Sequence, residues 1–227
     1  MRSEICYEDE QVIVAYKPAG LATQSSRIGQ IDMVSELKKH LSAKERGKEP
    51  YLGLIHRLDQ PVEGLLVFAK TKESAAALSK ELTKKTLNKS YKAVLCGCPE
   101  KKEGTLTDYL IKNKDNVAEI VDEKNPEAKR AVLQYQILKE KGDFALASIT
   151  IETGRFHQIR VQMSHLGVPL LGDLKYGGEG MREKSMSLSV TNVGLCADEI
   201  VFTHPKTKKH MKFSIEPKGK AFAVFEE

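Results

Sequence analysis

The stretch LIHRLDQPVEGLLVFAK, residues 54–70, joins a charged loop to an apolar run. Pro61 and Gly64 favour a turn, and the run from Leu65 to Ala69 is typical of a buried β-strand. Asp59 lies in the turn, ahead of that strand. A charged group so close to a buried strand is solvated, paired with an opposite charge or used in chemistry. A structural ion pair and a catalytic role are both open for Asp59 at this point.

Helices and strands interleave on both sides of this stretch. The patterns predict strands over 11–16, 65–69 and 91–96, a hairpin of 131–138 with 144–151, and a last pair near 199–204 and 210–215. They predict helices begun by Asp32 and ended by Gly47, and over 72–84 with Thr71 as the N-cap. The polar stretch 104–130 is ambiguous. The order of elements predicts an α+β fold with a mixed, mainly antiparallel sheet and flanking helices, and residues 1–227 are expected to form a single domain.

The composition is typical of a globular protein, with 41% hydrophobic and 30% charged residues. No apolar stretch approaches the roughly 20 residues that span a bilayer. The N-terminal segment MRSEICYEDE lacks the apolar region of a secretory signal, so a cytoplasmic location is expected. The four cysteines are too few and too scattered for a disulfide framework, and we expect them to be reduced.

The positive charge of the chain is concentrated in two places. The net charge is +5, and lysine is dense in 80–92 and 204–212. Such runs are often only solvated faces, but they permit a polyanionic partner such as RNA.

A second dense stretch begins at residue 152. Phe156, Ile159, Met163 and Leu166 recur at helical spacing, so we expect them to form the core side of a helix. Arg160 would then lie on a different, polar face, where it could bind a carboxylate in bidentate fashion or extend into solvent.

The chain lacks the sequence motifs of several common enzyme classes. It has no phosphate-binding P-loop, no dinucleotide-binding glycine motif and no G-x-S-x-G nucleophile motif. The histidines do not have the spacing of a zinc site. A metal-dependent hydrolase that uses His56 and Asp59 is the remaining alternative from this class, and no metal is expected in the preferred interpretation.

Four ordered stretches resemble the signature motifs of the RluA-type pseudouridine synthases. HRLDQPVEGLLVFAKT (56–71) is similar to the family pattern H-R-L-D-x-x-T-S-G-L-L-x-x-A-K-T. TGRFHQIRVQMSHLGVPLLGDLKYG (153–177) is similar to T-G-R-x-H-Q-I-R-x-x-x-x-H-x-G-x-P-x-x-G-D-x-x-Y-G. KPAGLATQ (17–24) and KSYKAVLCG (89–97) also agree, so the resemblance covers nearly the whole chain.

This resemblance implies a role for several residues. Asp59 would be the nucleophilic catalyst, Arg160 its salt-bridge partner and Tyr91 the residue that stacks on the target base. Arg57 would fill the space that the flipped nucleotide leaves. The matching motifs further imply substrate-binding positions at His56, Leu58, Lys17, Gly154, Arg155, His157 and Lys89. The implied fold is the pseudouridine synthase catalytic domain with a central RNA-binding cleft, without a preceding RNA-binding domain of the S4 type.

The activity implied is isomerisation of specific uridines in structured ribosomal or transfer RNA to pseudouridine. The uridine has to be flipped out of its stack to be reached. The reaction involves no redox change and no phosphate transfer, so no cofactor or nucleotide is expected, nor a membrane partner, and a monomer is the simplest assembly. The alternative is a catalytically inactive RNA-binding or assembly protein that keeps the fold.

Four positions depart from the family pattern. Val62 and Glu63 replace Thr-Ser, which adds a negative charge where a polyanion is expected to bind. Phe156 stands where a polar residue is common, and Cys196 where a histidine is common. These departures leave the implied reaction class unchanged and bear on which RNA is recognised.

Overall fold

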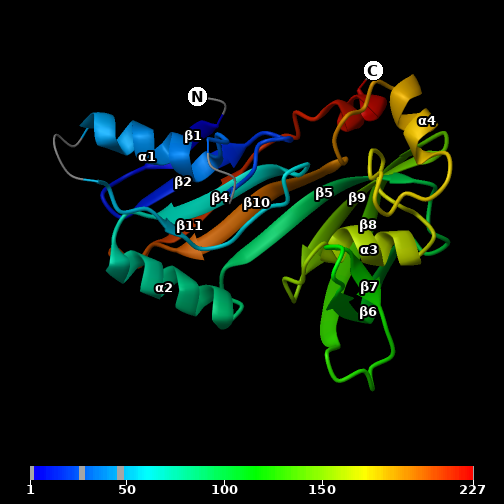
Figure 1. Cartoon of the computed structure of the whole chain (residues 1–227), viewed down its shortest axis with the longest axis horizontal. Helices are drawn as coiled ribbons and strands as arrows, with labels where there is room; N and C mark the ends of the chain where they lie inside the picture. The colour runs from blue at the N-terminus through cyan, green and yellow to red at the C-terminus, as the bar shows by residue number, and fades with distance from the viewer. Residues whose placement is uncertain (1–2, 26–28, 45–48, 227) are drawn as a thin grey trace. The chain divides into compact units, whose positions relative to one another are not determined.

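A computed structural model describes residues 3–25, 29–44 and 49–226 of the chain. The chain contacts divide it into two compact units (Figure 1). Unit 1 consists of residues Met1–Lys89 and Ala197–Lys218, and unit 2 of Ser90–Cys196 and Gly219–Glu227. The single catalytic domain expected from the sequence stays a prediction.

Unit 1 is built on antiparallel strands. Its elements are β1 (Glu4–Glu8), β2 (Val12–Lys17), α1 (Met33–Lys44), β3 (Gly53–Leu54), β4 (Glu63–Ala69), α2 (Lys72–Thr83), β11 (His210–Ser214) and most of β10 (Leu195–Thr203). β2 pairs with β1 and β4, β3 pairs with β4, and β11 pairs with β10. Every residue of β2 and β4 is buried, which explains their nearly continuous apolar sequences. The predicted strands at 11–16 and 65–69 are therefore confirmed.

Both helices of unit 1 begin where their capping residues predict. The Thr71 hydroxyl accepts a hydrogen bond from the backbone N–H of Ser74 (3.1 Å), and Leu78 of α2 packs into the core formed with β2 and β4. Asp32 accepts from the N–H of Ser35 (2.7 Å) ahead of α1. Gly47, the predicted end of this helix, lies outside the described residues.

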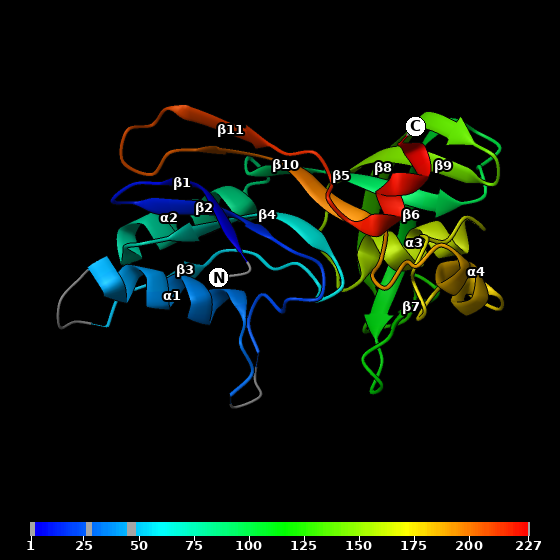
Figure 2. The same ribbon diagram turned by 90° about the horizontal axis from the view of Figure 1, so that it is seen from above.

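Unit 2 holds an antiparallel array in the order β5-β9-β8-β6-β7. Its elements are β5 (Asn88–Cys96, from Ser90 onward), β6 (Glu103–Lys112), β7 (Ala118–Ile120), β8 (Lys129–Lys141), β9 (Phe144–Ile151), α3 (Gln158–His165), α4 (Met181–Ser187) and the 3-10 helix η1 (Lys220–Phe225). β8 and β9 form the predicted hairpin, and the ambiguous stretch 104–130 contains β6 and β7. α3 packs against β6 and β7, and both views show it beside them (Figures 1 and 2).

The helix predicted around residues 156–166 differs from the structure in its start and in its polar face. α3 begins at Gln158, so Phe156 lies outside it and is 37% exposed instead of buried in the core. The Gln158 side chain accepts hydrogen bonds from the Thr153 hydroxyl and the Arg155 N–H, and these bonds hold a turn in front of the helix. Arg160 is only 5% exposed, because α3 is buried on several sides and not along one stripe.

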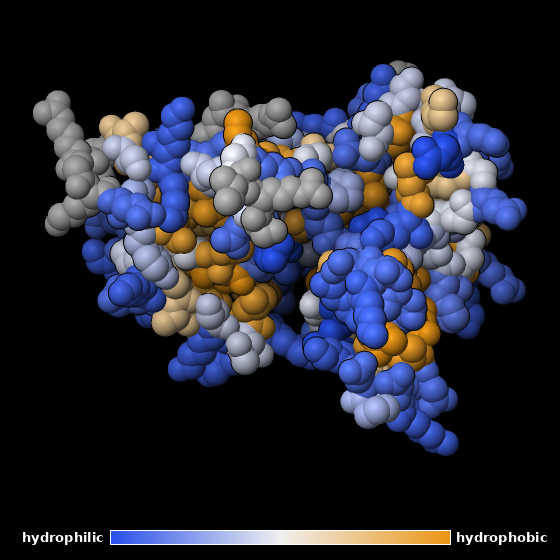
Figure 3. Space-filling model, viewed as in Figure 1, coloured by the Kyte–Doolittle hydropathy of each residue, from blue (hydrophilic) through white to orange (hydrophobic). Residues whose placement is uncertain are grey.

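Within each unit the strand pairs β1–β2, β2–β4, β5–β9 and β8–β9 are antiparallel, and helices flank the strands, as the sequence predicts for an α+β fold. No helix in the described ranges is long and apolar enough to cross a membrane. The four cysteines are free thiols. Hydrophilic residues cover most of the face seen in Figure 3, with hydrophobic residues showing between them.

Candidate active site

Asp59 lies in the loop that leads from β3 into β4. The Val62 N–H donates a hydrogen bond to the Asp59 carbonyl (3.0 Å), which closes the turn predicted around Pro61. Asp59 is half-buried, Leu58 beside it is buried, and Arg57 is exposed. The buried Leu58 side chain therefore anchors the loop. The charged residues Arg57 and Asp59 flank Leu58 in the sequence.

The segment after β2 holds this loop by a set of reciprocal hydrogen bonds. The Thr23 hydroxyl donates to the Leu58 carbonyl (2.8 Å) and accepts from the Leu58 N–H (3.2 Å). The Gly20 N–H donates to the Gln60 carbonyl (2.8 Å), and the Gln60 amide donates to the Gly20 carbonyl (3.1 Å). Residues on both sides of Asp59 are thus tied to the same neighbouring segment, which limits the positions open to its backbone.

Lys17, at the end of β2, also binds this loop, in addition to Thr23 and Gly20. Its side chain is fully buried, and Nζ donates to the carbonyls of Leu21 (2.7 Å), Pro18 (3.1 Å) and Gln60 (3.1 Å). Burial lowers the pKa of Lys17 to about 7, while the negative charges of Asp59 and Glu63 act in the opposite direction. Lys17 was predicted as a substrate-binding residue, and the structure places its ammonium group on backbone carbonyls beside the Asp59 loop.

Glu63 is buried as well, although the sequence suggested an added charge at the RNA surface. Its carboxylate accepts hydrogen bonds from the Tyr16 hydroxyl and from the Lys218 N–H. It is 1% exposed, so its charge is enclosed in the protein. The departure from Thr-Ser at this position is therefore an internal change next to Lys17.

His56 and Lys89 are the other predicted site residues of unit 1. His56 is buried, and the Val67 N–H donates to its Nε2 (3.4 Å). Burial lowers the pKa of His56 well below its usual value, and the charge of Lys89 adds to this effect, so the imidazole is neutral. Among the described residues, none lies within hydrogen-bonding reach of His56 Nδ1. Burial lowers the pKa of Lys89 to about 8.

In unit 2, Arg160 binds the carboxylate of Asp173. Arg160 Nε donates to one carboxylate oxygen and Nη2 to the other, each at 2.7 Å. Asp173 is fully buried and also accepts from the N–H groups of Lys175 (3.1 Å) and Tyr176 (3.2 Å). A guanidinium group has five N–H donors, so a bidentate bond to Asp173 is compatible with a second carboxylate partner. The predicted pairing of Arg160 with Asp59 stays a prediction.

His157 and Tyr176 form a second connected group near the start of α3. Tyr176 accepts a hydrogen bond from the Ala118 N–H (2.7 Å), and its hydroxyl is 2.8 Å from His157 Nδ1. The Arg160 guanidinium lies 5.1 Å from the centre of the Tyr176 ring. The Phe156 ring stacks on His157, with 3.7 Å between ring centres. This group links α3 to β7 and to the segment after Asp173.

The remaining predicted residues of unit 2 lie on β5 and in the loop before α3. Tyr91 is buried in β5, opposite Ile149 of β9. Gly154 and Arg155 are exposed, and the Arg155 Nε donates to the Arg130 carbonyl (2.9 Å). The structure therefore gathers Lys17, His56, Arg57, Leu58, Asp59 and Lys89 in unit 1, and Tyr91, Gly154, Arg155, His157 and Arg160 in unit 2.

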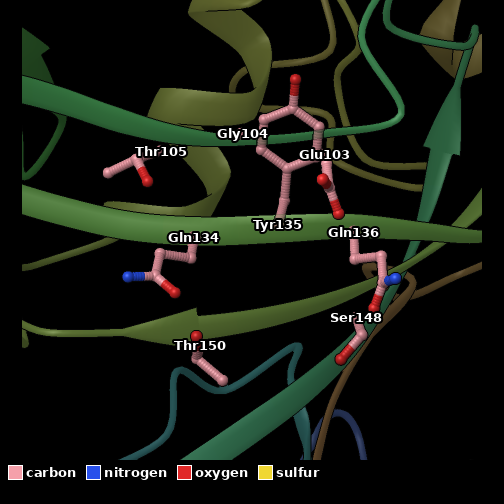
Figure 4. Close-up of a pocket in the computed structure, with 8 residues that line it drawn as sticks. All are labelled: Glu103, Gly104, Thr105, Gln134, Tyr135, Gln136, Ser148 and Thr150. Atoms are coloured by element: carbon pink, nitrogen blue, oxygen red, sulfur yellow. The ribbon is translucent and has the colours of Figure 1, made fainter.

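One hollow in unit 2 contains none of the predicted residues. It has a volume of about 490 Å³ and is lined by Glu103, Gly104, Thr105, Gln134, Tyr135, Gln136, Ser148 and Thr150. Figure 4 shows Gln134 and Gln136 on the opposite side of β8 from Tyr135, as strand alternation requires. The hollow is an open, polar part of the β6-β8-β9 surface.

Sequence reasoning missed three residues that position the site. Asp173 follows Gly172 in the apolar stretch VPLLGD, where a lone acid predicts a buried partner. Thr23 and Tyr16 carry no such signal, because ordinary hydroxyl side chains in strands and turns are common. Within the described ranges, no three His, Cys, Asp or Glu side chains lie close enough together to hold a metal ion.

Comparisons with known proteins agree with the motifs. A model of the RNA pseudouridylate synthase family matches residues 11–165. The chain is 33% identical over 221 residues to the ribosomal large subunit pseudouridine synthase D of Zymomonas mobilis, and the match covers 94% of this chain and 68% of that protein. It is 32% identical over 218 residues to the uncharacterized RNA pseudouridine synthase YlyB of Bacillus subtilis, covering 94% of this chain and 68% of that one.

A third relative and two solved structures extend this comparison. The ribosomal large subunit pseudouridine synthase C of Rickettsia bellii is 34% identical over 194 residues, covering 84% of this chain and 63% of that protein. The human RNA pseudouridylate synthase domain containing 4 protein has a similar fold, with a TM-score of 0.79 at 23% identity over 97% of this chain and 92% of that one. The human RNA pseudouridylate synthase domain containing 1 protein also has a similar fold. Its TM-score is 0.73 at 23% identity, over 95% of this chain and 83% of that one.

Proposed function

Because this chain belongs to the RNA pseudouridylate synthase family, we propose that it isomerises specific uridines of ribosomal or transfer RNA to pseudouridine, with Asp59 as the nucleophilic catalyst. Members of this family are isomerases that act on RNA, which confirms the predicted family and enzyme class. The two similar human structures confirm the predicted fold class. The names of two relatives refer to the large ribosomal subunit, which supports ribosomal RNA as the first substrate to test.

The observation that carries this proposal is the way the Asp59 loop is held. Hydrogen bonds to Thr23, Gly20 and Lys17 hold Leu58 and Gln60, the two neighbours of Asp59. A reactive carboxylate needs a position that is defined before the substrate arrives, because an error of about 1 Å costs about a hundredfold in rate. A protein that only binds RNA needs the lysines of its surface but not a carboxylate that is held in this manner.

The reaction itself explains what Asp59 has to do. The N1–C1′ bond of the uridine breaks, the uracil turns, and C5 bonds to C1′, after which the hydrogen on C5 leaves as a proton and N1 takes up a proton from water. Asp59 acts at the centre that joins the sugar to the base, either on the ribose or as a base in an elimination. In the proposed site Arg160 pairs with Asp59, Tyr91 stacks on the uracil, and Arg57 fills the space left by the flipped nucleotide. The uridine leaves its stack at a cost of a few kcal/mol.

The experiment that tests the proposal measures release of tritium from RNA labelled at uracil C5. Ribosomal and transfer RNA are incubated separately with the protein, without added metal or nucleotide. We expect release by the wild type and a loss of several orders of magnitude in Asp59→Asn, as for other catalytic side chains. Asp143→Asn is the matched control, because Asp143 is an exposed aspartate in the turn between β8 and β9.

Each outcome of this assay has a defined meaning. Release from only one RNA class identifies the substrate class. Equal release by Asp59→Asn and wild type would remove Asp59 as the nucleophile. No release from either RNA, with RNA binding intact, would favour the non-catalytic RNA-binding protein. A cytoplasmic location and a monomeric state stay predictions, and sedimentation of the wild-type protein tests the second.

A further inference from the structure

We propose that Phe156, with Lys112 and Arg155, forms a second nucleotide-binding subsite, which stacks one base of the substrate RNA other than the uridine that is isomerised. This inference rests on the proposed function, since it concerns how the same RNA is held. All three residues belong to unit 2.

The Phe156 ring is exposed and is also held in place. It is 37% exposed, and its plane lies at 22° to the imidazole of His157, with the ring centres 3.7 Å apart. Single exposed apolar side chains are common and need no explanation by themselves. An exposed ring that is fixed on a second ring is different, because its orientation is set before any partner binds.

The support under the Phe156 ring reaches into the body of unit 2. His157 has a left-handed backbone (φ 53°), and its Nδ1 is 2.8 Å from the Tyr176 hydroxyl. The Tyr176 ring meets the imidazole edge-on, with centres 5.6 Å apart, and its hydroxyl accepts from the Ala118 N–H on β7. The Phe156 ring therefore stacks on His157, His157 contacts Tyr176, and Tyr176 is hydrogen-bonded to β7.

One cation lies over the exposed ring, and a second cationic residue precedes Phe156 in the chain. Lys112 Nζ lies 4.7 Å from the centre of the Phe156 ring, and Arg155 precedes Phe156 in the chain. The Arg155 Nε donates to the carbonyl of Arg130, which holds the guanidinium group at the surface. Lys112, Arg155 and Arg130 are all exposed. An aromatic ring among exposed cations suits a nucleotide, whose base stacks while its phosphate binds the positive charge.

The cation–π contact between the Lys112 ammonium group and the Phe156 ring is weak because it is exposed to solvent. Stacking of a base on an aromatic side chain is stronger than an exposed contact between a lysine ammonium and an aromatic ring. A base can therefore displace Lys112, and the flexible lysine side chain can then bind the phosphate of the same nucleotide. Gly154, two residues before Phe156, borders open space, since a Cβ built on it meets no atom within 4 Å.

The first test replaces Phe156 with Trp, Leu and Ser and measures the dissociation constants for ribosomal RNA and for transfer RNA. A base stack predicts an order in which Trp binds at least as tightly as Phe, and Leu and Ser both bind about 5- to 150-fold more weakly. Thermal unfolding of each variant confirms that it is folded. Leu138→Ser is the matched control, because Leu138 is an exposed apolar residue of β8 in the same unit.

Leu in place of Phe156 distinguishes stacking from ordinary apolar contact. If Phe156→Leu binds like the wild type while Phe156→Ser is weak, the side chain supplies apolar area and the proposal is overturned. Equal affinities for all variants would overturn it as well. The KM for RNA is expected to rise by more than kcat falls, because the subsite holds a nucleotide that does not react.

The second test identifies the nucleotide. RNA carrying 5-iodouracil at one position at a time is irradiated on the Asp59→Asn protein, and crosslinked peptides are identified by mass spectrometry. A crosslink to Phe156 from a nucleotide beside the target supports the subsite, whereas a crosslink only from the target uridine overturns it. Binding and crosslinking do not depend on turnover. The subsite can therefore stand if tritium release fails, and it can fail while tritium release is observed.

Discussion

Lys17 in unit 1 and Arg160 in unit 2 are both buried cations of the candidate site, and the protein compensates their charges differently. Lys17 faces three neutral backbone carbonyls, with the carboxylates of Asp59 and Glu63 acting on it electrostatically. Arg160 donates two hydrogen bonds to the carboxylate of Asp173. Carbonyl dipoles stabilise a buried charge less completely than a paired carboxylate does.

This difference decides how each cation responds to its surroundings. Lysine loses its proton readily when it is buried, and the pKa of Lys17 is lowered to about 7. Arginine stays protonated in proteins, so Arg160 keeps its charge. The Asp59 loop therefore contacts a buried cation that titrates near neutrality, whereas the buried cation of α3 is permanently charged and is held by the Asp173 carboxylate.

The largest effect is expected from Asp173→Asn. Removing the carboxylate leaves the Arg160 charge buried with weaker compensation, and loss of one partner of a buried ion pair costs about 3–5 kcal/mol. Urea denaturation measures the free energy of unfolding. Glu49→Gln is the control, since the Lys38–Glu49 pair is exposed and such pairs contribute little to stability. Equal losses in the two variants would contradict the importance of the Arg160–Asp173 pair.

Lys17→Met tests the titrating cation. Folded Lys17 has a pKa of about 7, and the unfolded chain keeps the ordinary value of about 10.4, so between these pH values the unfolded state binds more protons. The stability of the wild type relative to Lys17→Met should therefore rise with pH above 7, by up to about 1.4 kcal/mol per pH unit, and be constant below it. Urea denaturation of both proteins from pH 6 to pH 10 measures this difference. A constant difference across the whole range would show that Lys17 stays charged.

A smaller effect is expected from Thr23→Val, which removes the uncharged hydroxyl group that is hydrogen-bonded to Leu58 in the Asp59 loop. The variant leaves the N–H and C=O of buried Leu58 without the Thr23 hydroxyl, at a cost of about 1–3 kcal/mol. Because Leu58 precedes Asp59, kcat should fall by more than KM changes. Thr71→Ala is the matched control, since it removes the N-cap of α2, costs about 1 kcal/mol and should leave kcat unchanged. An equal change of kcat in both variants would contradict the positioning role of Thr23.

The sequence by itself determined the features that depend on neighbouring residues and on the order of the motifs. Thr71 and Asp32 begin helices because a side-chain oxygen can reach an N–H two or three residues away, whatever the rest of the fold. Alternating and continuous apolar runs predicted β2, β4 and the β8–β9 hairpin for the same local reason. The ordered motifs from Lys17 to Gly177 identified the family, because so many fixed spacings seldom occur together by chance.

Only the tertiary structure decided which charges are buried and what they bind. The partner of Arg160, thirteen residues along the chain, depends on how the segment after α3 folds back, and burial of Glu63 depends on Tyr16 and Lys218. Helical periodicity placed Phe156 in the core, but hydrogen bonds of Gln158 to Thr153 and Arg155 start α3 later and leave the ring at the surface. Such outcomes depend on contacts between distant segments and on the competition of side chains for backbone hydrogen bonds. Local sequence patterns carry neither kind of information.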